Sequence, residues 1–125
     1  MIERVNIDGL FRMPSTSHAV VVDGIVYVSG VLGTIGDGLE LARGGVAGQT
    51  KQALGNVERV LGACGADFTG LVRTNVYLTS PEDFLDMEQA YAALVTTAPA
   101  RIVVYCSALP LGAAVEIDAV AHRSR

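Results

Sequence analysis

Residues 98–121, "APARIVVYCSALPLGAAVEIDAVA", contain two apolar, β-rich runs that are joined through "ALPLGA". The runs predict strands over residues 101–107 and 113–121, which we expect to pair as a β-hairpin. Three charged residues lie inside these strands: Arg101, Glu116 and Asp118. Because a charge among apolar residues is costly unless it is paired or used, these three are the first candidates for a functional site.

The preceding part of the chain predicts further strands and two helices. The stretch "HAVVVDGIVYVSG" is typical of two strands around the turn Asp23-Gly24. Apolar residues recur at helical spacing over residues 47–64, and "LVRTNVYLT" (71–79) alternates as a strand does. Ser80 is a typical cap for a second helix. The buried face of that helix is expected to comprise Phe84, Met87, Tyr91 and Leu94.

This order of elements predicts an α+β fold, with one sheet that carries both helices on one face, in a single domain over residues 1–125. The first hairpin is apolar on both faces. We expect one face to hold Val20, Val22, Val26 and Val28, and the other to hold Val21, Ile25 and Tyr27. An apolar second face has to be covered, so we expect an oligomer.

Composition narrows the possible functions. Hydrophobic residues make up 50% of the chain and the net charge is −4, with no basic run. This balance argues against binding nucleic acid through a charged patch. No apolar run approaches the roughly 20 residues of a membrane span, and "MIERVNIDGLF" is not typical of a signal peptide, so we expect a cytoplasmic protein. Cys64, Cys106, His18 and His122 show no metal-ligand spacing; we expect two reduced thiols and no metal.

Arg101 has two interpretations. An arginine at the end of a strand often pairs with a nearby acid. Alternatively, its planar guanidinium grips the carboxylate of a substrate through two parallel hydrogen bonds. Val103 lies two residues further on and therefore shares its face of the strand.

Glu116 and Asp118 also share one face of their strand. A solvated polar face explains Asp118. If a neighbouring subunit closes that face, Glu116 becomes a partly desolvated carboxylate that is able to hold and activate a water molecule. On adjacent strands, Arg101 and Glu116 would form a carboxylate anchor and a proton-transfer group. Ser29, as a hydroxyl donor, and His18, as an acid or base, are weaker candidates, since a lone histidine is more often satisfied locally.

From about Ser17 onward, several stretches follow one another nearly without gaps: "SHAVVVDGIVYVSG", "GGVAGQTKQALGNVERVLGACGADFTGLVRTNVYLT", "DFLDMEQAYAAL", "PARIVV" and "LPLGAAVEIDAVA". Together they resemble the Rid family of reactive-intermediate (enamine/imine) deaminases, also called YjgF-like or endoribonuclease L-PSP-like. The resemblance implies a chorismate-mutase-like α+β fold, in which a single mixed sheet carries two helices on one face. It also implies a homotrimer with its sites in the clefts between subunits.

The resemblance further implies roles for particular residues. Arg101 would bind the carboxylate of a 2-aminoacrylate-type enamine or of its imine tautomer. Backbone groups of Val103 would contact the reacting nitrogen, and Glu116 would orient the attacking water. Ser29 and Tyr91 complete the substrate-binding residues that we expect, and no cofactor is needed.

Four positions depart from the common family pattern: Thr16, Val31, Glu88 and Val103 stand where Tyr, Gln, Asn and Cys or Thr are common. These changes alter the polar wall around Arg101 and Glu116, and a more apolar pocket would suit a larger or ring-derived imine. The lost polar residues favour an alternative, a non-catalytic trimer that binds small carboxylates or partner proteins. A third reading, an RNA-cleaving protein, is disfavoured by the net charge.

Overall fold

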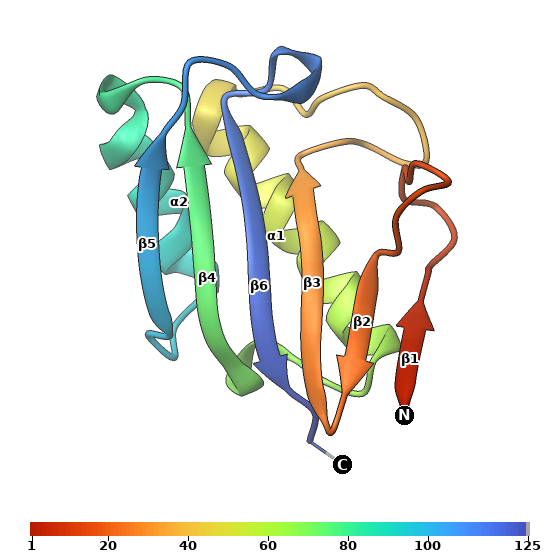
Figure 1. The fold of residues 1–125 in the computed structure, drawn as a ribbon. Coiled ribbons are helices and arrows are strands. Elements are labelled where there is room, and N and C mark those ends of the chain that lie inside the picture. The colour runs from red at the N-terminus through yellow and green to blue at the C-terminus, as the bar shows by residue number, and fades with distance from the viewer. Residues whose placement is uncertain (125) are drawn as a thin grey trace.

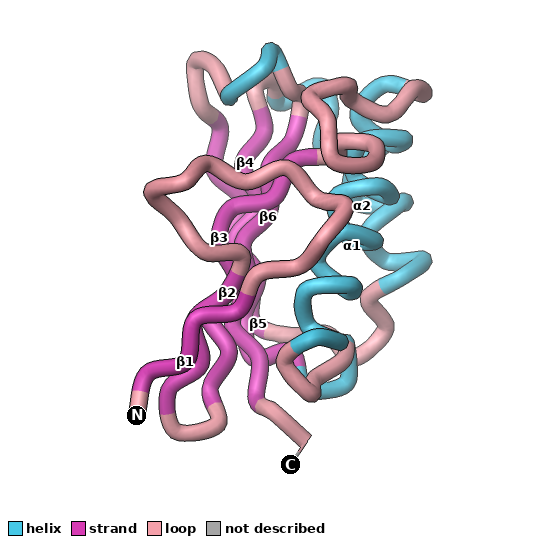
Figure 2. Tube along the Cα trace, turned by 90° about the vertical axis from the view of Figure 1, so that its right-hand side faces the viewer, coloured by secondary structure: helices cyan, strands magenta, loops and turns pink. Residues whose placement is uncertain are grey.

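Six strands form one sheet, and two helices cover one of its faces (Figures 1 and 2). This computed structural model describes residues 1–124. The order of strands across the sheet is β1-β2-β3-β6-β4-β5, and every neighbouring pair is antiparallel except β4 and β5. The elements are β1 (Ile2–Val5), β2 (Ala19–Val22), β3 (Ile25–Leu32), α1 (Gly45–Ala63), β4 (Leu71–Leu78), α2 (Phe84–Leu94), β5 (Ala100–Tyr105) and β6 (Val115–His122). The α+β class and the mixed sheet are thus confirmed.

The first hairpin forms where the sequence predicts it. Asp23 and Gly24 both have positive φ, 52° and 79°, which is the backbone of the tight turn that suits the twist of a hairpin. The predicted division of its faces is wrong. Val21 pairs with Val26, and residues directly opposite each other in an antiparallel pair share a face. Both are buried under the helices, whereas Val20, Val22, Ile25 and Tyr27 lie on the uncovered face.

The two helices pack side by side behind the sheet in Figure 1. The apolar side of α1 is buried, as its helical spacing predicts. Before α2, Ser80 Oγ accepts a hydrogen bond from the Glu82 amide at 3.2 Å, and a 3₁₀ turn leads into the helix. Met87 and Tyr91 are buried as expected, but Leu94 is 39% exposed.

The predicted hairpin between the last two strands is wrong. β4 lies between β5 and β6 and pairs with both. The reason is the connection through α2, because a strand–helix–strand crossover places its two strands parallel and side by side. β6 therefore fills the place between β3 and β4, and β5 becomes an edge strand.

The core lies between the sheet and the helices. Its fully buried side chains include Leu54 and Leu61 of α1, Val76 of β4, Met87 of α2 and Ile117 of β6. Each such side chain stabilises the fold by about 1.5–3 kcal/mol relative to an exposed one. Within residues 1–124, neither helix combines the length and the apolar character that a membrane crossing requires.

Candidate functional site

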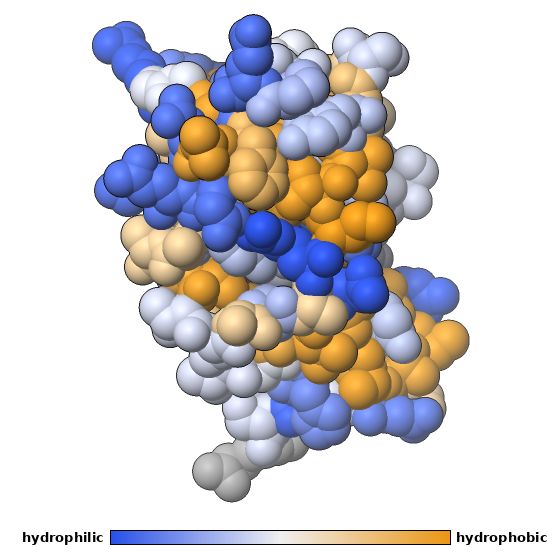
Figure 3. All heavy atoms as spheres, turned by 90° about the vertical axis from the view of Figure 1, so that its left-hand side faces the viewer, coloured by the Kyte–Doolittle hydropathy of each residue, from blue (hydrophilic) through white to orange (hydrophobic). Residues whose placement is uncertain are grey.

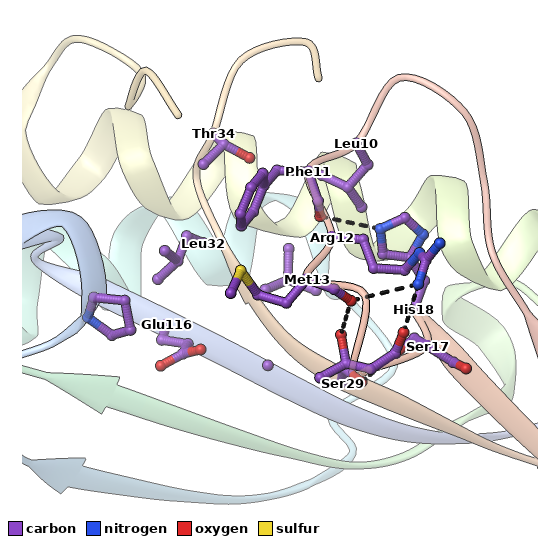
Figure 4. Close-up of a pocket in the computed structure, with 14 residues that line it drawn as sticks. Leu10, Phe11, Arg12, Met13, Ser17, His18, Ser29, Leu32, Thr34 and Glu116 are labelled. Carbon is purple, nitrogen blue, oxygen red and sulfur yellow. Dashed lines mark hydrogen bonds between the residues drawn. The ribbon is translucent and has the colours of Figure 1, made fainter. Parts of the chain in front are cut away.

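A cavity of about 420 Å³ lies between the loop that follows β1 and the strands β3 and β6 (Figure 4). Its apolar walls include Phe11, Met13 and Leu32, and its polar groups include Ser29 and Glu116. In Figure 4 the Met13 side chain extends over the cavity toward Leu32 and Glu116. We call this space the Glu116 cavity.

A bulge in β3 shapes one wall of the Glu116 cavity. The register of β3 on β6 shifts between Val28 and Val31, so Ser29 and Gly30 are the irregular residues. Bulges re-aim side chains and occur often beside functional sites. The Ser29 hydroxyl donates to the Ser17 carbonyl oxygen over 2.6 Å, so its proton holds the loop. Only the lone pairs of this hydroxyl remain for a ligand.

The His18 side chain also holds the loop that follows β1, through hydrogen bonds of its ring. It is buried, its Nδ1 accepts the Ile7 N–H at 3.0 Å, and its Nε2 lies 3.1 Å from the Phe11 carbonyl oxygen. Because Nδ1 accepts, Nε2 carries the proton and donates to that oxygen. Both ring nitrogens are therefore occupied within the chain, and the local interpretation of this histidine is confirmed.

Glu116 stands in β6 between Leu32 of β3 and Tyr77 of β4, on the face that the helices leave uncovered. Its side chain is half-buried and packs against Gly30. Burial raises the pKa of this carboxyl above its ordinary value, and the nearby Asp118 carboxylate adds to the rise. A carboxyl group of raised pKa exchanges a proton with bound water more readily near neutral pH.

Asp118 is held differently from Glu116, although the two share a face. Its carboxylate accepts a hydrogen bond from Asn75 Nδ2 at 2.8 Å and from the Tyr77 hydroxyl at 2.9 Å. The bond from Tyr77 is the main reason why the pKa of that hydroxyl is raised. The expectation of a polar face thus holds for Asp118, which is partly exposed and is also satisfied by side chains of the neighbouring strand. Glu116 is the carboxylate that borders a cavity.

A second cavity, of about 450 Å³, lies between α2 and the start of β5. Arg101 and Tyr91 line it, and the segment that joins α2 to β5 contributes Val95, Ala98 and Pro99. We call this space the Arg101 cavity. It contains two of the residues that the sequence assigns to substrate binding.

The Tyr91 ring packs against the guanidinium of Arg101. The guanidinium carbon Cζ of Arg101 lies 4.8 Å from the centre of the Tyr91 ring, a distance at which a cation is attracted to a ring face. The Tyr91 hydroxyl lies 2.6 Å from Thr74 Oγ1, and both residues are buried. The guanidinium also pairs with Glu88, so Arg101 is fixed from two directions. The pairing of an arginine with a nearby acid is thus the observed state of this chain.

The sequence predicts that Arg101 and Glu116 lie on adjacent strands, and this prediction is wrong. β4 separates them, with Thr74 opposite Arg101 and Tyr77 opposite Glu116. Arg101 turns toward the helix layer, and Glu116 turns toward the uncovered face. The two cavities have no lining residue in common, so within the described chain they are separate.

Val103 lies near the Arg101 cavity but does not line it. Its side chain is half-buried against the core, on the same face as Arg101. Because β5 is an edge strand, alternate backbone N–H and C=O groups point away from β4 and have no strand partner within residues 1–124. Backbone groups on that edge are the donors and acceptors that the assignment of Val103 requires.

The arrangement offers a cation for an anionic group and a carboxyl for proton transfer. Within residues 1–124 no group of three or more His, Cys, Asp or Glu side chains is placed to hold a metal ion.

Residues 13–123 match the family model described as Endoribonuclease L-PSP. The chain belongs to the Rid family.

Curated Rid proteins are similar over most of the chain. The chain is 42% identical over 106 residues to the human 2-iminobutanoate/2-iminopropanoate deaminase, a match that covers 84% of this chain and 77% of the human protein. It is 39% identical over 108 residues to Protein DfrA of Myxococcus xanthus, covering 84% and 82% of the two chains. Among solved structures, RidA from an Antarctic Psychrobacter has a TM-score of 0.89 at 33% identity, with 96% and 98% of the chains covered. The Rid fold that the sequence predicts is thus found.

Sequence reasoning missed two groups of residues in this Rid chain. Phe11 and Met13 lie before the stretch that carries the resemblance, in a loop without periodic pattern, so no sequence signal places them at a cavity. Asn75 and Tyr77 sit at alternate positions of a strand, which shows their common face but not their bond to Asp118. The sequence did carry a signal for the contact between Glu88 and Arg101, because Glu88 departs from the family pattern.

Proposed function

We propose that this chain is a hydrolytic deaminase of short-lived 2-imino acids and of the enamines that are their tautomers. Water adds to the imine carbon, the C=N bond becomes a C–N single bond, and the nitrogen gains a proton. The C–N bond then breaks as the hydroxyl proton passes to the nitrogen, so ammonia leaves and the C=O bond of a 2-keto acid forms. Support comes from the 42% identical human protein, which is named for such a reaction.

Arg101 is the residue that we assign to the substrate carboxylate. The observation that carries the proposal is its placement: a half-buried guanidinium over the Tyr91 ring, in a cavity with apolar walls at Val95 and Pro99. A guanidinium binds a carboxylate through two parallel hydrogen bonds, and such a pair is stronger where water is partly excluded. An imine of low stability then needs little more than a fixed position and a water molecule.

Glu116 is the residue that we assign to the water. In its partly desolvated position the ionised carboxylate accepts a proton from the attacking water, and the carboxyl so formed returns that proton to the leaving nitrogen. Ser29, on the same cavity, offers a lone pair to a ligand N–H. Backbone groups of Val103 on the edge of β5 are assigned to the reacting nitrogen.

Because the Arg101 and Glu116 cavities are separate in one chain, the proposal includes a homotrimer in which the Arg101 cavity of one copy and the Glu116 cavity of the next are the two half-sites of one joined site. The uncovered sheet face supports this assembly. Its exposed apolar residues include Tyr27, Ile102 and Val104, which are 50%, 51% and 36% exposed. Figure 3 shows hydrophobic side chains gathered over much of the side of the molecule at which β5 lies, crossed by a hydrophilic band.

The test supplies freshly generated 2-iminopropanoate and longer imino acids to the full chain and follows the release of ammonia or keto acid. We expect release faster than the uncatalysed rate, and loss of the acceleration in Arg101→Ala. Binding of keto acids without any acceleration would overturn the proposal and favour the non-catalytic binder. Faster turnover of longer or ring-derived imines would extend it to the substrates that the apolar walls suit.

A further inference from the structure

The guanidinium of Arg101 already has a carboxylate of its own chain beside it. Arg101 Nη1 donates to Glu88 Oε1 over 2.5 Å, and within residues 1–124 this is the only hydrogen bond of the Arg101 side chain. Glu88 reaches Arg101 from α2, while Arg101 stands on β5. A guanidinium has five N–H donors, so most of the fork is left for a ligand.

Both charges belong to the same cavity. Glu88 and Arg101 line the Arg101 cavity together, and their side chains are 40% and 22% exposed. A ligand carboxylate that pairs with the free donors of Arg101 therefore lies close to the carboxylate of Glu88. Two negative groups on one guanidinium repel each other unless a positive group lies beside both.

We propose that Glu88 is a specificity-determining residue, which makes the Arg101 cavity prefer small carboxylates that carry a cationic nitrogen on the adjacent carbon. The inference rests on the proposed function, in which Arg101 holds the ligand carboxylate. The ligand carboxylate takes the free donors of Arg101, and an N–H of the ligand nitrogen donates to Glu88. The four charges then alternate in sign around the site.

This arrangement distinguishes the substrate of the proposed reaction from its product. A protonated 2-imino acid carries N–H donors beside its carboxylate, and Glu88 accepts one of them. The keto acid carries a carbonyl oxygen at that position, which has no proton to donate and points its negative end at Glu88. Glu88 thus favours binding of the imine and departure of the keto acid.

Two stable probes test the preference. Pyruvate has the carboxylate without a cationic nitrogen, and L-alanine has both. Calorimetry on the full chain measures the Kd of each probe for wild type, Glu88→Gln and Glu88→Ser. We expect the neutral variants to bind pyruvate roughly 10-fold more tightly and L-alanine roughly 10-fold more weakly, the scale of one charge contact at a partly exposed site.

Two further variants serve as controls. Glu88→Asp, which keeps the charge, should retain the wild-type order of the two probes. Asp86→Asn removes a negative charge from an exposed position of the same helix and should leave both Kd values unchanged. A ratio of the two Kd values that is the same in wild type and both neutral variants would overturn the inference, as would a failure of these variants to bind pyruvate at all.

The outcome can be separated from that of the proposed function. If imines are hydrolysed while the ratio of Kd values does not move, the deaminase stands and the role of Glu88 is refuted. If the ratio moves while no imine is hydrolysed, Glu88 selects ligands of a binding protein, and the proposed reaction is refuted.

Discussion

Glu116 lies so close to Gly30 that no side chain fits between them. A Cβ atom at Gly30 would lie 2.5 Å from Glu116 Oε2 and 3.1 Å from Glu116 Cδ. Gly30 is not among the glycines of positive φ, so its backbone conformation does not demand glycine. The missing side chain instead permits the carboxylate to lie over the bulge of β3, where it borders the Glu116 cavity.

Gly30→Ala is therefore expected to displace Glu116 while leaving the fold in place. The clash involves the end of a flexible side chain, so the melting temperature should change little. Displacement of a catalytic group by about 1 Å costs up to roughly 100-fold in rate, and we expect kcat for imine hydrolysis to fall on that scale. Gly38→Ala, where an added Cβ meets nothing within 4 Å, is the matched control and should keep full activity.

Glu116→Gln is expected to slow imine hydrolysis by roughly 100-fold or more, the usual scale for loss of a general acid or base. The amide keeps the shape of the side chain but cannot take a proton from water. Ligand binding should persist, because Arg101 is untouched. Full activity of this variant with an authentic imine would refute the assignment of Glu116.

The same variant makes a prediction about stability. Folding raises the pKa of Glu116, so the native state binds a proton more tightly than the unfolded chain. Its contribution to stability is complete below the ordinary carboxyl pKa of the unfolded chain and is lost as pH rises through the folded value. As pH rises through the folded pKa, the melting temperature of Glu116→Gln should therefore increase relative to that of wild type. At neutral pH the variant should melt at the higher temperature. A higher melting temperature for wild type than for the variant at neutral pH would show that the folded protein stabilises the ionised carboxylate.

The sequence predicts nearly every element of this fold but misplaces one pairing. The turn Asp23-Gly24 and the apolar spacing over residues 47–64 are local signals, and both elements form there. The partner of residues 101–107 is not local, because it depends on the crossover through α2 that brings β5 beside β4. Adjacency in sequence suggested a hairpin where the chain makes a parallel pair.

The candidate site was also predicted only in part, because its residues carry local signals but their arrangement depends on non-local strand order. Arg101 and Glu116 are notable in sequence because each is a charge within an apolar strand, and each borders a cavity. Their separation across β4 depends on strand order, which no residue pattern within either strand reveals. The contact between Glu88 and Arg101 joins a helix to a strand, and only their positions in the fold show it.

The buried hydrogen bond between Tyr91 and Thr74 predicts a loss of stability that is separate from ligand binding. Tyr91→Phe keeps the ring beneath Arg101 but leaves the buried Thr74 hydroxyl without its partner, which costs about 1–3 kcal/mol. Urea unfolding should show this loss, and Thr74→Val combined with Tyr91→Phe should recover part of it. Tyr105→Phe, at a 48% exposed position, is the control. Equal stability of Tyr91→Phe and wild type would mean that this bond contributes nothing net.

Arg101→Ala is expected to abolish the binding of small imino and keto acids while the protein stays folded. Arg101→Lys should restore little, because an ammonium cannot form the two parallel bonds of a guanidinium. Calorimetry measures the binding, and circular dichroism checks the fold. If Arg101→Ala instead lowers the melting temperature but leaves the ligand affinity of the folded protein unchanged, then Arg101 serves only as the partner of Glu88.

The joining of the two half-sites predicts that assembly and activity are lost together. Ile102 points to the uncovered sheet face from the edge strand β5 and is 51% exposed, so a charge there should block a neighbouring copy without disturbing the core. We expect light scattering to find a trimer for wild type and monomers for Ile102→Glu, with the same circular dichroism spectrum and no imine hydrolysis. Leu85→Glu is the matched control, since Leu85 is 76% exposed on α2 in the helix layer, and it should remain trimeric and active. A wild type that is a stable monomer at micromolar concentration would refute the joined site. So would an Ile102→Glu monomer that still hydrolyses imines at the wild-type rate, because its Arg101 and Glu116 cavities would then act apart.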